Sequence, residues 1–224
     1  GSLPALGLAA LAEALARQEG NLSMERIDTD ILVIGGGSGG LSVAAGAVQM
    51  GARVVLLEGH KMGGDCLNYG CVPSKALLAA AAVAHGQGGN AAMGVAPGKN
   101  TVSYGKAKDF VASVIGQIAP HDSVARFEGL GVTVIEDYGH FISPTEVHAG
   151  ERVITARRIV IATGSSPFVP PIPGLSEVPY YTNETIFDLR ERPDHLLVIG
   201  GGTIGMEMAQ AHRLRHREHR HGFP

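Results

Sequence analysis

The chain has 224 residues, of which 45% are hydrophobic and 17% charged, and this balance excludes collagen-like, coiled-coil and disordered proteins. The net charge is −3 with neutral histidines, and no basic stripe runs along the body of the chain, so nucleic-acid binding is not predicted. No apolar run reaches the roughly 18 residues that a membrane helix needs, so no membrane span is predicted either. The two cysteines lie too close in sequence to form the disulfide framework of a small secreted domain.

Residues 1–23 form an Ala/Leu-rich segment that differs in composition from the sequence after it. Gly1-Ser2 is typical of a cloning scar, and Leu3–Arg17 could form one short amphipathic helix. The segment lacks the basic start of a signal peptide. We therefore interpret it as a leader or linker, with Met24 as a candidate natural start.

An alternation of apolar strands and helices follows, which is typical of an α/β fold. Its first part is a strand at 30–34, a glycine turn at 35–40, a helix at 41–50 and a strand at 53–57. Its second part is a helix from Pro73 to about Ala84, a loop at 87–100, helices at 103–118 and 124–127, a strand at 132–135, and short strands within 145–164 that turn at Gly150-Glu151. The proline-rich stretch at 167–179 is typical of a linker, and a second strand (195–199), turn (200–205) and helix (206–211) come after it.

The first glycine cluster contains G-x-G-x-x-G at Gly35, Gly37 and Gly40, between a strand and a helix. Gly35 permits a tight turn, Gly37 lets a pyrophosphate approach the backbone, and Gly40 lets the helix pack on the strand. Glu58 ends the next strand, where it can accept hydrogen bonds from an adenosine ribose. The helix N-terminus adds free N–H groups for an anion, so we predict dinucleotide binding, with an unliganded structural turn as the alternative.

The second motif, GGDCLNYGCVPSK at Gly63–Lys75, contains both cysteines. Residues five apart on a regular helix are separated by about 7.5 Å along the axis, whereas the Cα atoms of a disulfide lie roughly 4.4–6.8 Å apart. If Cys66 and Cys71 pair, the segment between them is therefore not an ideal helix, and Gly70 offers the freedom for that. A helix that starts at Pro73 places Cys71 at its N-terminus, where the dipole favours a thiolate. A redox-active dithiol needs this arrangement; two buried free thiols or half a zinc site are the alternatives.

This motif resembles the active-site segment of the class I pyridine nucleotide-disulfide oxidoreductases, which include dihydrolipoamide dehydrogenase, mercuric reductase and glutathione reductase. The stretches VIGGGSGG at 33–40, IATG at 161–164 and IGGGTIGME at 199–207 occur in that family's order, so the resemblance covers about residues 28–211. Pro-Ser-Lys at 73–75 is closer to the lipoamide dehydrogenase and mercuric reductase versions. The resemblance implies a Rossmann-like FAD-binding domain in three layers, with a parallel sheet and a small β-meander, and then the start of a second Rossmann-like domain that binds NAD(P).

The resemblance also divides the chain into segments. The expected segments are the leader or linker at 1–23, an FAD-binding domain without its returning C-terminal segment at 24–168, a connector at 169–192, the first strand, turn and helix of the NAD(P)-binding domain at 193–211, and a His/Arg-rich tail at 212–224. The tail, HRLRHREHRHGFP, does not match the family, and we expect a lost reading frame or a truncation near His212. We expect a solvated tail, with weak metal binding by His212, His216, His219 and His221 as the alternative.

Roles for individual residues follow from the resemblance. Cys71 would be the thiolate beside the flavin and Cys66 the interchange thiol on the substrate side, while Lys75, paired with Glu207, would lie near the reactive edge of the flavin. The implied cofactor-binding residues are Gly35, Gly37, Ser38, Gly39, Gly40, Glu58, Gly64, Thr163 and Gly164 for FAD, and Gly200, Gly202 and Gly205 for NAD(P)H. No resident metal site is predicted.

The implied activity is an FAD-dependent dithiol/disulfide oxidoreductase that passes electrons between NAD(P)H, FAD, a Cys66–Cys71 disulfide and a small-molecule disulfide or metal-ion substrate. A dithiol that must cycle fits a cytoplasmic location. Relatives in the family are homodimers, and the domain that forms the dimer and supplies a histidine to its partner's active site has no counterpart in this sequence. The alternative is therefore a truncated, non-catalytic FAD-binding fragment, and we expect little turnover by this chain alone.

Overall fold

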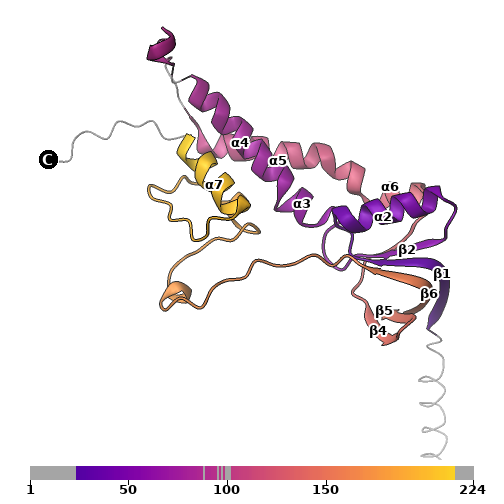
Figure 1. The fold of residues 1–224 in the computed structure, drawn as a ribbon. Helices are drawn as coiled ribbons and strands as arrows, with labels where there is room; N and C mark the ends of the chain where they lie inside the picture. The colour runs from indigo at the N-terminus through magenta and orange to yellow at the C-terminus, as the bar shows by residue number, and fades with distance from the viewer. Residues whose placement is uncertain (1–23, 88, 95, 97, 99–101, 215–224) are drawn as a thin grey trace, which may run out of the picture.

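The computed structural model describes residues 24–87, 89–94, 96, 98 and 102–214, so the expected leader helix and His216, His219 and His221 lie outside the described residues. It has a mixed α/β fold (Figure 1). The strands are β1 (Glu25–Ile34), β2 (Val54–Leu57), β3 (Thr133–Ile135), β4 (His140–Ser143), β5 (Glu146–Ala149) and β6 (Arg152–Ile161). The helices are α2 (Ser38–Gln49), α3 (Gly64–Asn68), α4 (Cys71–Gly86), α5 (Tyr104–Ile118), α6 (Val124–Gly129) and α7 (Thr203–Leu214), with short 3₁₀ turns η1 (Ala91–Met93), η2 (Ala119–Asp122), η3 (Leu175–Glu177) and η4 (Ile186–Asp188).

The six strands form one sheet in the order β3-β2-β1-β6-β5-β4. β3, β2, β1 and β6 are parallel neighbours, whereas β5 is antiparallel to both β6 and β4. β1 and β6 pair along their whole length, from Glu25 opposite Arg152 to Ile34 opposite Ile161. β2 pairs only with the second half of β1 and β5 only with the first half of β6, so the two long strands join a parallel part to an antiparallel meander.

Side-chain alternation along these strands produces three layers, as expected from the sequence. Alternate residues of a strand point to opposite faces of the sheet. One face of the parallel strands packs against the meander, in a cluster of Leu32, Val55, Leu57, Ile135, Val147, Ala149, Ile154 and Ala156. The other face packs against helices α2 and α6, in a cluster of Val33, Leu41, Ala44, Val54, Leu56, Phe127 and Val132. Helices, parallel strands and meander are therefore stacked in that order (Figure 1).

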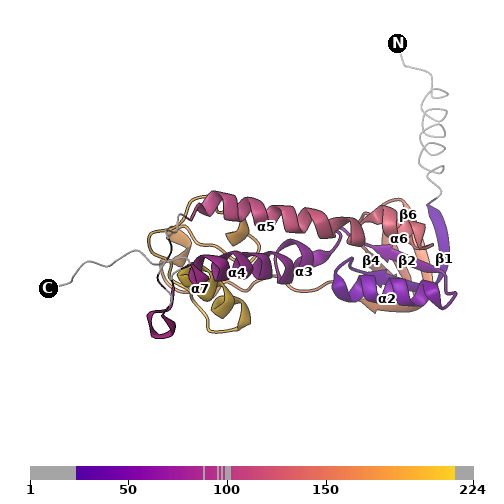
Figure 2. The same cartoon turned by 90° about the horizontal axis from the view of Figure 1, so that it is seen from above.

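A third cluster holds helices α4, α5 and α7 together, away from the sheet. Figure 2 shows α4 and α5 running side by side away from the strands, with α7 against α4. The buried residues of this cluster are Ala76, Leu77, Val111, Ile186, Met208 and Ala211. Ile186 comes from η4, so the expected connector at 169–192 is more than a linker: part of it is packed into this helical core.

The strand expected at 195–199 is not formed. A strand needs a neighbour for its backbone N–H and C=O groups, and no described strand pairs with this segment. Leu197 and Ile199 are accordingly 77% and 57% exposed. Helix α7 nevertheless forms and begins at Thr203, earlier than the expected start at Met206, because a helix satisfies its backbone groups internally.

His212 was expected in a solvated tail, and this expectation was wrong. Helix α7 continues to Leu214, which places His212 one turn after Met208 on the buried face of the helix. The ring Nδ1 of His212 lies 2.8 Å from the carbonyl oxygen of Met208, and its Nε2 lies 3.2 Å from the hydroxyl of Tyr104. Both ring nitrogens therefore have protein partners, and the side chain is part of the contact between α7 and α5.

Helix α5 buries a lysine. Lys108 is only 2% exposed, whereas Phe110 on the same helix is 46% exposed. The ammonium of Lys108 donates to the carbonyl of Ile186 at 2.8 Å and lies 5.6 Å and 5.2 Å from the ring centroids of Tyr104 and Phe187. A carbonyl and two aromatic faces replace part of the lost hydration of the charge.

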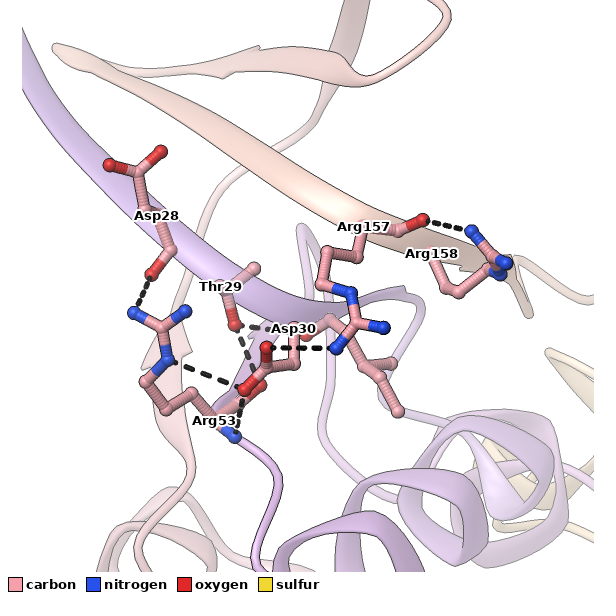
Figure 3. Close-up of polar contacts among 7 residues, drawn as sticks. Asp28, Thr29, Asp30, Arg53, Arg157 and Arg158 are labelled. Atoms are coloured by element: carbon pink, nitrogen blue, oxygen red, sulfur yellow. Dashed lines mark hydrogen bonds and ion pairs between the residues drawn. The ribbon is translucent and has the colours of Figure 1, made fainter.

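A network of ionic and polar contacts joins β1, β2 and β6 near the start of their parallel part (Figure 3). Asp30 accepts from the backbone N–H of Arg53 at 3.0 Å and from its Nε at 3.3 Å, and Arg157 lies 3.7 Å away. The backbone hydrogen bond from Arg53, followed by its guanidinium, lowers the pKa of Asp30. The network lies where β2 begins and midway along β1 and β6, away from the glycine turn, so we assign it to strand pairing.

One described stretch, Gly64–Gly86, is long and apolar enough to pass a simple test for a membrane-crossing helix, with a mean hydropathy of 1.2. It consists of α3 and α4, contains Asp65 and Lys75, and packs against α5 and α7 through Ala76 and Leu77. Core helices of globular domains pass the same test, so it is weak evidence for a span.

We expect Gly40→Ala to destabilise the fold, because a Cβ at this position would overlap the backbone carbonyl of Gly35. The loss in the free energy of unfolding should be about 2–3 kcal/mol, the cost of overpacking a rigid site. Gly46→Ala, in the same helix with open space around its Cβ, is the matched control and should stabilise by about 0.5–1 kcal/mol. Urea unfolding monitored by circular dichroism measures both; equal effects of the two changes would contradict the close contact.

Candidate functional site

The first glycine turn joins the end of β1 to the start of α2 at the carboxyl edge of the parallel strands. Gly35 has φ +111°, and a Cβ there would overlap the carbonyl of Ala162. A Cβ at Gly40 would overlap the carbonyl of Gly35 and lie 3.2 Å from Val33. The turn geometry expected from the motif is therefore present.

Helix α2 begins with its N-terminal amides available for an anion. Its N-cap is Gly37, which has no side chain to accept hydrogen bonds from the first turn. A Cβ added at Gly39 would meet nothing within 4 Å, so the space outside the first turn is open. Free N–H groups, the positive end of the helix dipole and open space are the requirements for a phosphate site. Ser38 is the first residue of the helix, but its hydroxyl has no role in a cap.

Glu58 lies beside this turn, as the sequence predicts. Its carboxylate accepts from the backbone N–H of Gly36 at 2.6 Å and from that of His60 at 2.7 Å. The carboxylate has about four acceptor positions, so these two bonds fix its orientation and leave acceptor capacity for ribose hydroxyls.

Thr163 and Gly164, which follow β6, come to the same place. Ala162 donates its N–H to the carbonyl of Ile34 at 2.7 Å, and a Cβ at Gly35 would lie 3.1 Å from the nitrogen of Thr163. Thr163 and Gly164 are exposed, so this part of the strand edge is open to a ligand. The ends of β1, β2 and β6 therefore bring together the residues expected to bind FAD; their binding role remains a prediction.

The loop that carries the cysteines is attached by its backbone to this glycine turn. Gly63 donates its N–H to the carbonyl of Gly36 at 2.9 Å, and Gly37 and Gly63 form an isolated parallel bridge. Gly64 has φ +56°, and a Cβ there would lie 2.6 Å from the Cα of Gly37. Only glycine at position 64 allows this approach, so the cysteine loop has a defined position relative to the start of α2.

The two cysteines lie on either side of a break between two helices. Cys66 is in α3 and half-buried; Cys71 is the first residue of α4 and exposed. The chain between them leaves helical geometry at Gly70, which has φ −119° and ψ −113°. The segment between the cysteines is not an ideal helix, as a pair would require, and the expected place of Cys71 at a helix N-terminus is confirmed, although the helix begins two residues before Pro73.

Both thiols are free, and they interact with each other. Burial, followed by the hydrogen bond and charge of Cys71, raises the pKa of the Cys66 thiol. The carboxylate of Asp122, in η2, adds to this increase in the pKa of Cys66. Cys66 therefore loses its proton at a higher pH than an ordinary thiol, because its pKa is raised.

The pair expected between Lys75 and Glu207 is present. The Nζ of Lys75 lies 2.6 Å from Oε1 of Glu207, which joins α4 to α7 directly after the cysteine loop. Hydrogen bonds from Lys75 and Ser74 lower the pKa of the Glu207 carboxyl. The contact brings the second glycine motif to the dithiol; the catalytic role of the two residues remains a prediction.

The second glycine turn repeats the local geometry of the first. Gly200 has φ +112°, close to the +111° of Gly35. A Cβ at Gly205 would overlap the carbonyl of Gly200 and lie 3.4 Å from Val198, as a Cβ at Gly40 would overlap Gly35 and approach Val33. Met206 donates its N–H to the carbonyl of Gly202 at 3.0 Å, and in the first turn Leu41 donates to the carbonyl of Gly37 at 2.8 Å. The second turn therefore has the local geometry of the first although no described strand pairs with the segment before it; its nucleotide-binding role remains a prediction.

Sequence reasoning missed several contacts that hold the cysteine loop. The Nδ2 of Asn68 donates to the carbonyls of Gly64 and Met62, at 2.8 Å and 3.2 Å. The hydroxyl of Tyr69 lies 3.3 Å from Nε2 of His60, and the ammonium of Lys61 lies 5.1 Å from the centroid of the Tyr69 ring. The sequence offered one sign of these contacts, which is that the residues that make them lie inside or next to the cysteine motif.

Asp65 makes another contact that the sequence did not reveal. Its Oδ1 accepts from Nδ2 of Asn183 at 2.9 Å, so the connector reaches back to the cysteine loop. No local pattern predicts a contact between residues so far apart in the sequence. Among the described residues, no group of three or more His, Cys, Asp or Glu side chains is arranged to hold a metal ion.

The arrangement of a glycine turn, a dithiol loop and a second glycine turn is shared with known proteins. The family described as pyridine nucleotide-disulphide oxidoreductase matches residues 29–219. This chain belongs to that family. The match continues beyond residue 211, where the resemblance was expected to end, and so includes part of the segment expected not to match.

Curated relatives are mainly mercuric reductases. The chain is 35% identical over 183 residues to the mercuric reductase of Bacillus cereus, covering 82% of this chain and 29% of that protein. It is 38% identical over 199 residues to the mercuric reductase of Acidithiobacillus ferrooxidans, covering 81% and 34%. It is 34% identical over 201 residues to the dihydrolipoyl dehydrogenase of Acholeplasma laidlawii, covering 80% and 55%.

Solved structures show the same fold. The HOCl-induced flavoprotein disulfide reductase RclA from Escherichia coli superposes with a TM-score of 0.70 at 27% identity, covering 83% of this chain and 40% of that one. This confirms a Rossmann-like flavoprotein fold. The chain spans 29–34% of the first three curated relatives that it matches.

We expect the two thiols to react differently with iodoacetamide, because the raised pKa of Cys66 delays its conversion to the thiolate until higher pH. Mass spectrometry of the two cysteine peptides against pH should give a Cys66 rate curve that lies at higher pH than that of a free cysteine peptide. In Cys71→Ser the Cys66 curve should move partly back, since burial is the largest cause of the shift. A Cys66 curve that matches the free peptide would contradict the assignment.

The Lys75–Glu207 pair should contribute to stability only where Glu207 is ionised. Because the folded-state pKa of Glu207 is lowered, its stabilisation is present above the usual pKa of glutamate and is lost as the pH falls through the lower folded value. Glu207→Gln should reduce the free energy of unfolding by about 0.5 kcal/mol at neutral pH, as exposed ion pairs do, and by nothing in strong acid. Urea unfolding at several pH values tests this, with Glu128→Gln on exposed α6 as the control; a loss that persists in acid would argue against the ion pair.

Proposed function

We propose that this chain carries the flavin-binding and dithiol half of an FAD-dependent oxidoreductase of the mercuric reductase or dihydrolipoyl dehydrogenase type. In this reading NAD(P)H, FAD and the Cys66–Cys71 pair exchange electrons with a small-molecule disulfide or a metal ion. The relatives named as mercuric reductase and dihydrolipoyl dehydrogenase support both substrate classes.

The observation that carries this proposal is the backbone junction between the dithiol loop and the first glycine turn. Gly63 is hydrogen-bonded to Gly36, and Gly64 packs against Gly37 in the first glycine turn. Cys66 comes two residues after Gly64, so it lies close to the start of the expected nucleotide site. A structural pair of buried thiols would need no such junction. The exposure of Cys71 also favours a reactive pair over a structural one.

The residues at the strand edge fit FAD. The uncapped start of α2 suits the pyrophosphate, the carboxylate of Glu58 suits a ribose, and the exposed Thr163 and Gly164 suit the flavin side. Bound FAD would supply two-electron chemistry between a nicotinamide and the dithiol. Gly200, Gly202 and Gly205 would begin the NAD(P)H site, because their turn repeats the geometry of the first.

The protein's own part in the reaction is thiol–disulfide exchange. The thiolate of Cys66 attacks one sulfur of a substrate disulfide and releases the other sulfur as a thiolate, which leaves a mixed disulfide. Cys71 then attacks Cys66, the mixed disulfide breaks, and the second substrate thiolate leaves. The dithiol loses two electrons to form the Cys66–Cys71 disulfide, and the substrate gains them. Lys75, held by Glu207, would lie near the reactive edge of the flavin.

The setting of the reaction follows from the same chemistry. A dithiol that must be reduced again after each cycle requires a reducing compartment, so we propose a cytoplasmic location. A homodimer, as in the family, would complete the active site from a partner chain. The second candidate is an FAD-binding protein without turnover, which the segment 195–199 before the second glycine turn favours, because no described strand pairs with it.

The visible spectrum of the purified chain with added FAD, before and after two-electron reduction, tests the proposal. We expect a flavin spectrum that remains with the protein on gel filtration, and a long-wavelength charge-transfer band after reduction. Cys71→Ser should abolish the band, and Cys66→Ser should retain it, because only Cys71 is expected to place a thiolate beside the flavin. Retained flavin without a band in any variant would favour the second candidate; a colourless protein would contradict both.

A further inference from the structure

The side chain that precedes Cys66 is an acid held against the dithiol loop. Asp65 lies in α3, and its Oδ1 accepts from Asn183 at 2.9 Å. Its other oxygen, Oδ2, lies on the Gly70 side, because a Cβ added at Gly70 would be 2.8 Å from it. Gly70 directly precedes Cys71, so the carboxylate lies along the segment that joins the two cysteines. The contact with Asn183 fixes it there.

A second carboxylate approaches the same thiol from another element. Asp122, half-buried in η2, is close enough to disfavour the negative form of Cys66. Neither Asp65 nor Asp122 takes part in any ion pair among the described residues. The lysine of the motif, Lys75, is already paired with Glu207, and Lys61 lies against the ring of Tyr69. Asp65 and Asp122 therefore bring negative charge towards Cys66 that no ion pair among the described residues neutralises.

We propose that Asp65 selects substrates by charge, so that the dithiol reacts with neutral or cationic oxidants in preference to anionic disulfides. This deepens the proposed function and rests on it for the claim that the dithiol acts on a substrate. The substrate class is then a thiophilic cation or an uncharged disulfide. A disulfide that carries carboxylates next to its sulfurs must approach Asp65 and Asp122 with like charge, and each such approach is unfavourable.

The size of the effect follows from exposed charges in water. Two unit charges about 7 Å apart interact by about the thermal energy in water, which corresponds to a factor of two to three in rate, and salt reduces this factor. The effect is a preference between substrates and does not block either class. It also differs from any change in the reactivity of the thiols, since it depends on the charge of the second reactant.

The test compares two disulfide reagents on the reduced full chain: dithiobis(nitrobenzoate), a dianion, and dithiodipyridine, which is neutral at pH 8. A protein thiolate attacks either reagent, one aromatic thiolate leaves, and the second cysteine displaces the other, so both reactions oxidise the dithiol by two electrons. Both reagents react with the same protein thiolate, so the ratio of the two rates does not depend on how much of the cysteine is ionised. Asp65→Asn keeps the size of the side chain and an acceptor for Asn183.

We expect Asp65→Asn to raise the ratio of the dianion rate to the neutral rate by about threefold, and Asp122→Asn to raise it in the same direction. Glu151→Gln is the matched control and should leave the ratio unchanged. Its backbone carbonyl pairs with Glu25 at the start of β1, about 30 Å from the glycine turn along a ten-residue strand.

A measurement on the unaltered chain keeps the proposal falsifiable even if a variant does not fold. Added salt should raise the rate with the dianion and leave the rate with the neutral reagent unchanged. A ratio that is independent of salt, or that changes equally in Asp65→Asn and Glu151→Gln, would overturn the proposal. The rate ratio can be measured without flavin, so it is independent of the flavin-linked function. A changed ratio in Asp65→Asn without a charge-transfer band would support charge selection and reject the flavin-linked function. A charge-transfer band with an unchanged ratio would support the flavin-linked function and reject charge selection.

Discussion

The candidate site depends on one backbone contact, the meeting of the first glycine turn with the loop in front of Cys66. Gly36 and Gly63 share a hydrogen bond, and the Cα of Gly37 leaves no room for a side chain at Gly64. Any Cβ at Gly64 would push the loop away from the start of α2. The position of both cysteines relative to the expected nucleotide site is therefore set by the absence of side chains. The acids and bases around the dithiol then act on a pair whose place is already defined.

The two glycine turns separate what local sequence determines from what tertiary structure determines. Gly35 and Gly200 adopt nearly the same φ, and Gly40 and Gly205 meet the carbonyl of the first glycine of their turn in the same way. The first turn follows a strand that is paired on both sides, whereas the segment before the second has no strand partner among the described residues. The turn and the helix start are thus local properties of the motif, while the strand depends on a neighbour.

The same distinction explains how far the sequence could be interpreted. Short apolar runs predicted the second half of β1 together with β2 and β3, and the glycine and cysteine motifs predicted where α2 and α4 begin to within a few residues. It did not predict β4, whose side chains are largely exposed and show no apolar alternation. Nor could it predict that Lys108 and His212 are buried, because Lys108 bonds the carbonyl of Ile186 and His212 contacts the hydroxyl of Tyr104, partners that lie far away in the sequence. Polar residues are buried where tertiary partners exist, and local patterns carry no information on those partners.

Charge around the dithiol is arranged in two different ways, and the difference has a physical consequence. Lys75 and Glu207 neutralise each other at 2.6 Å, so their net field a few ångströms away is that of a dipole and falls off quickly. Asp65 is held by a neutral amide, which fixes its position and leaves its charge uncompensated. An ion pair therefore connects α4 to α7 without changing the potential far from the pair, whereas a carboxylate bonded to an amide keeps acting on whatever approaches Cys66. Of the two arrangements, only the second can distinguish one substrate from another by charge.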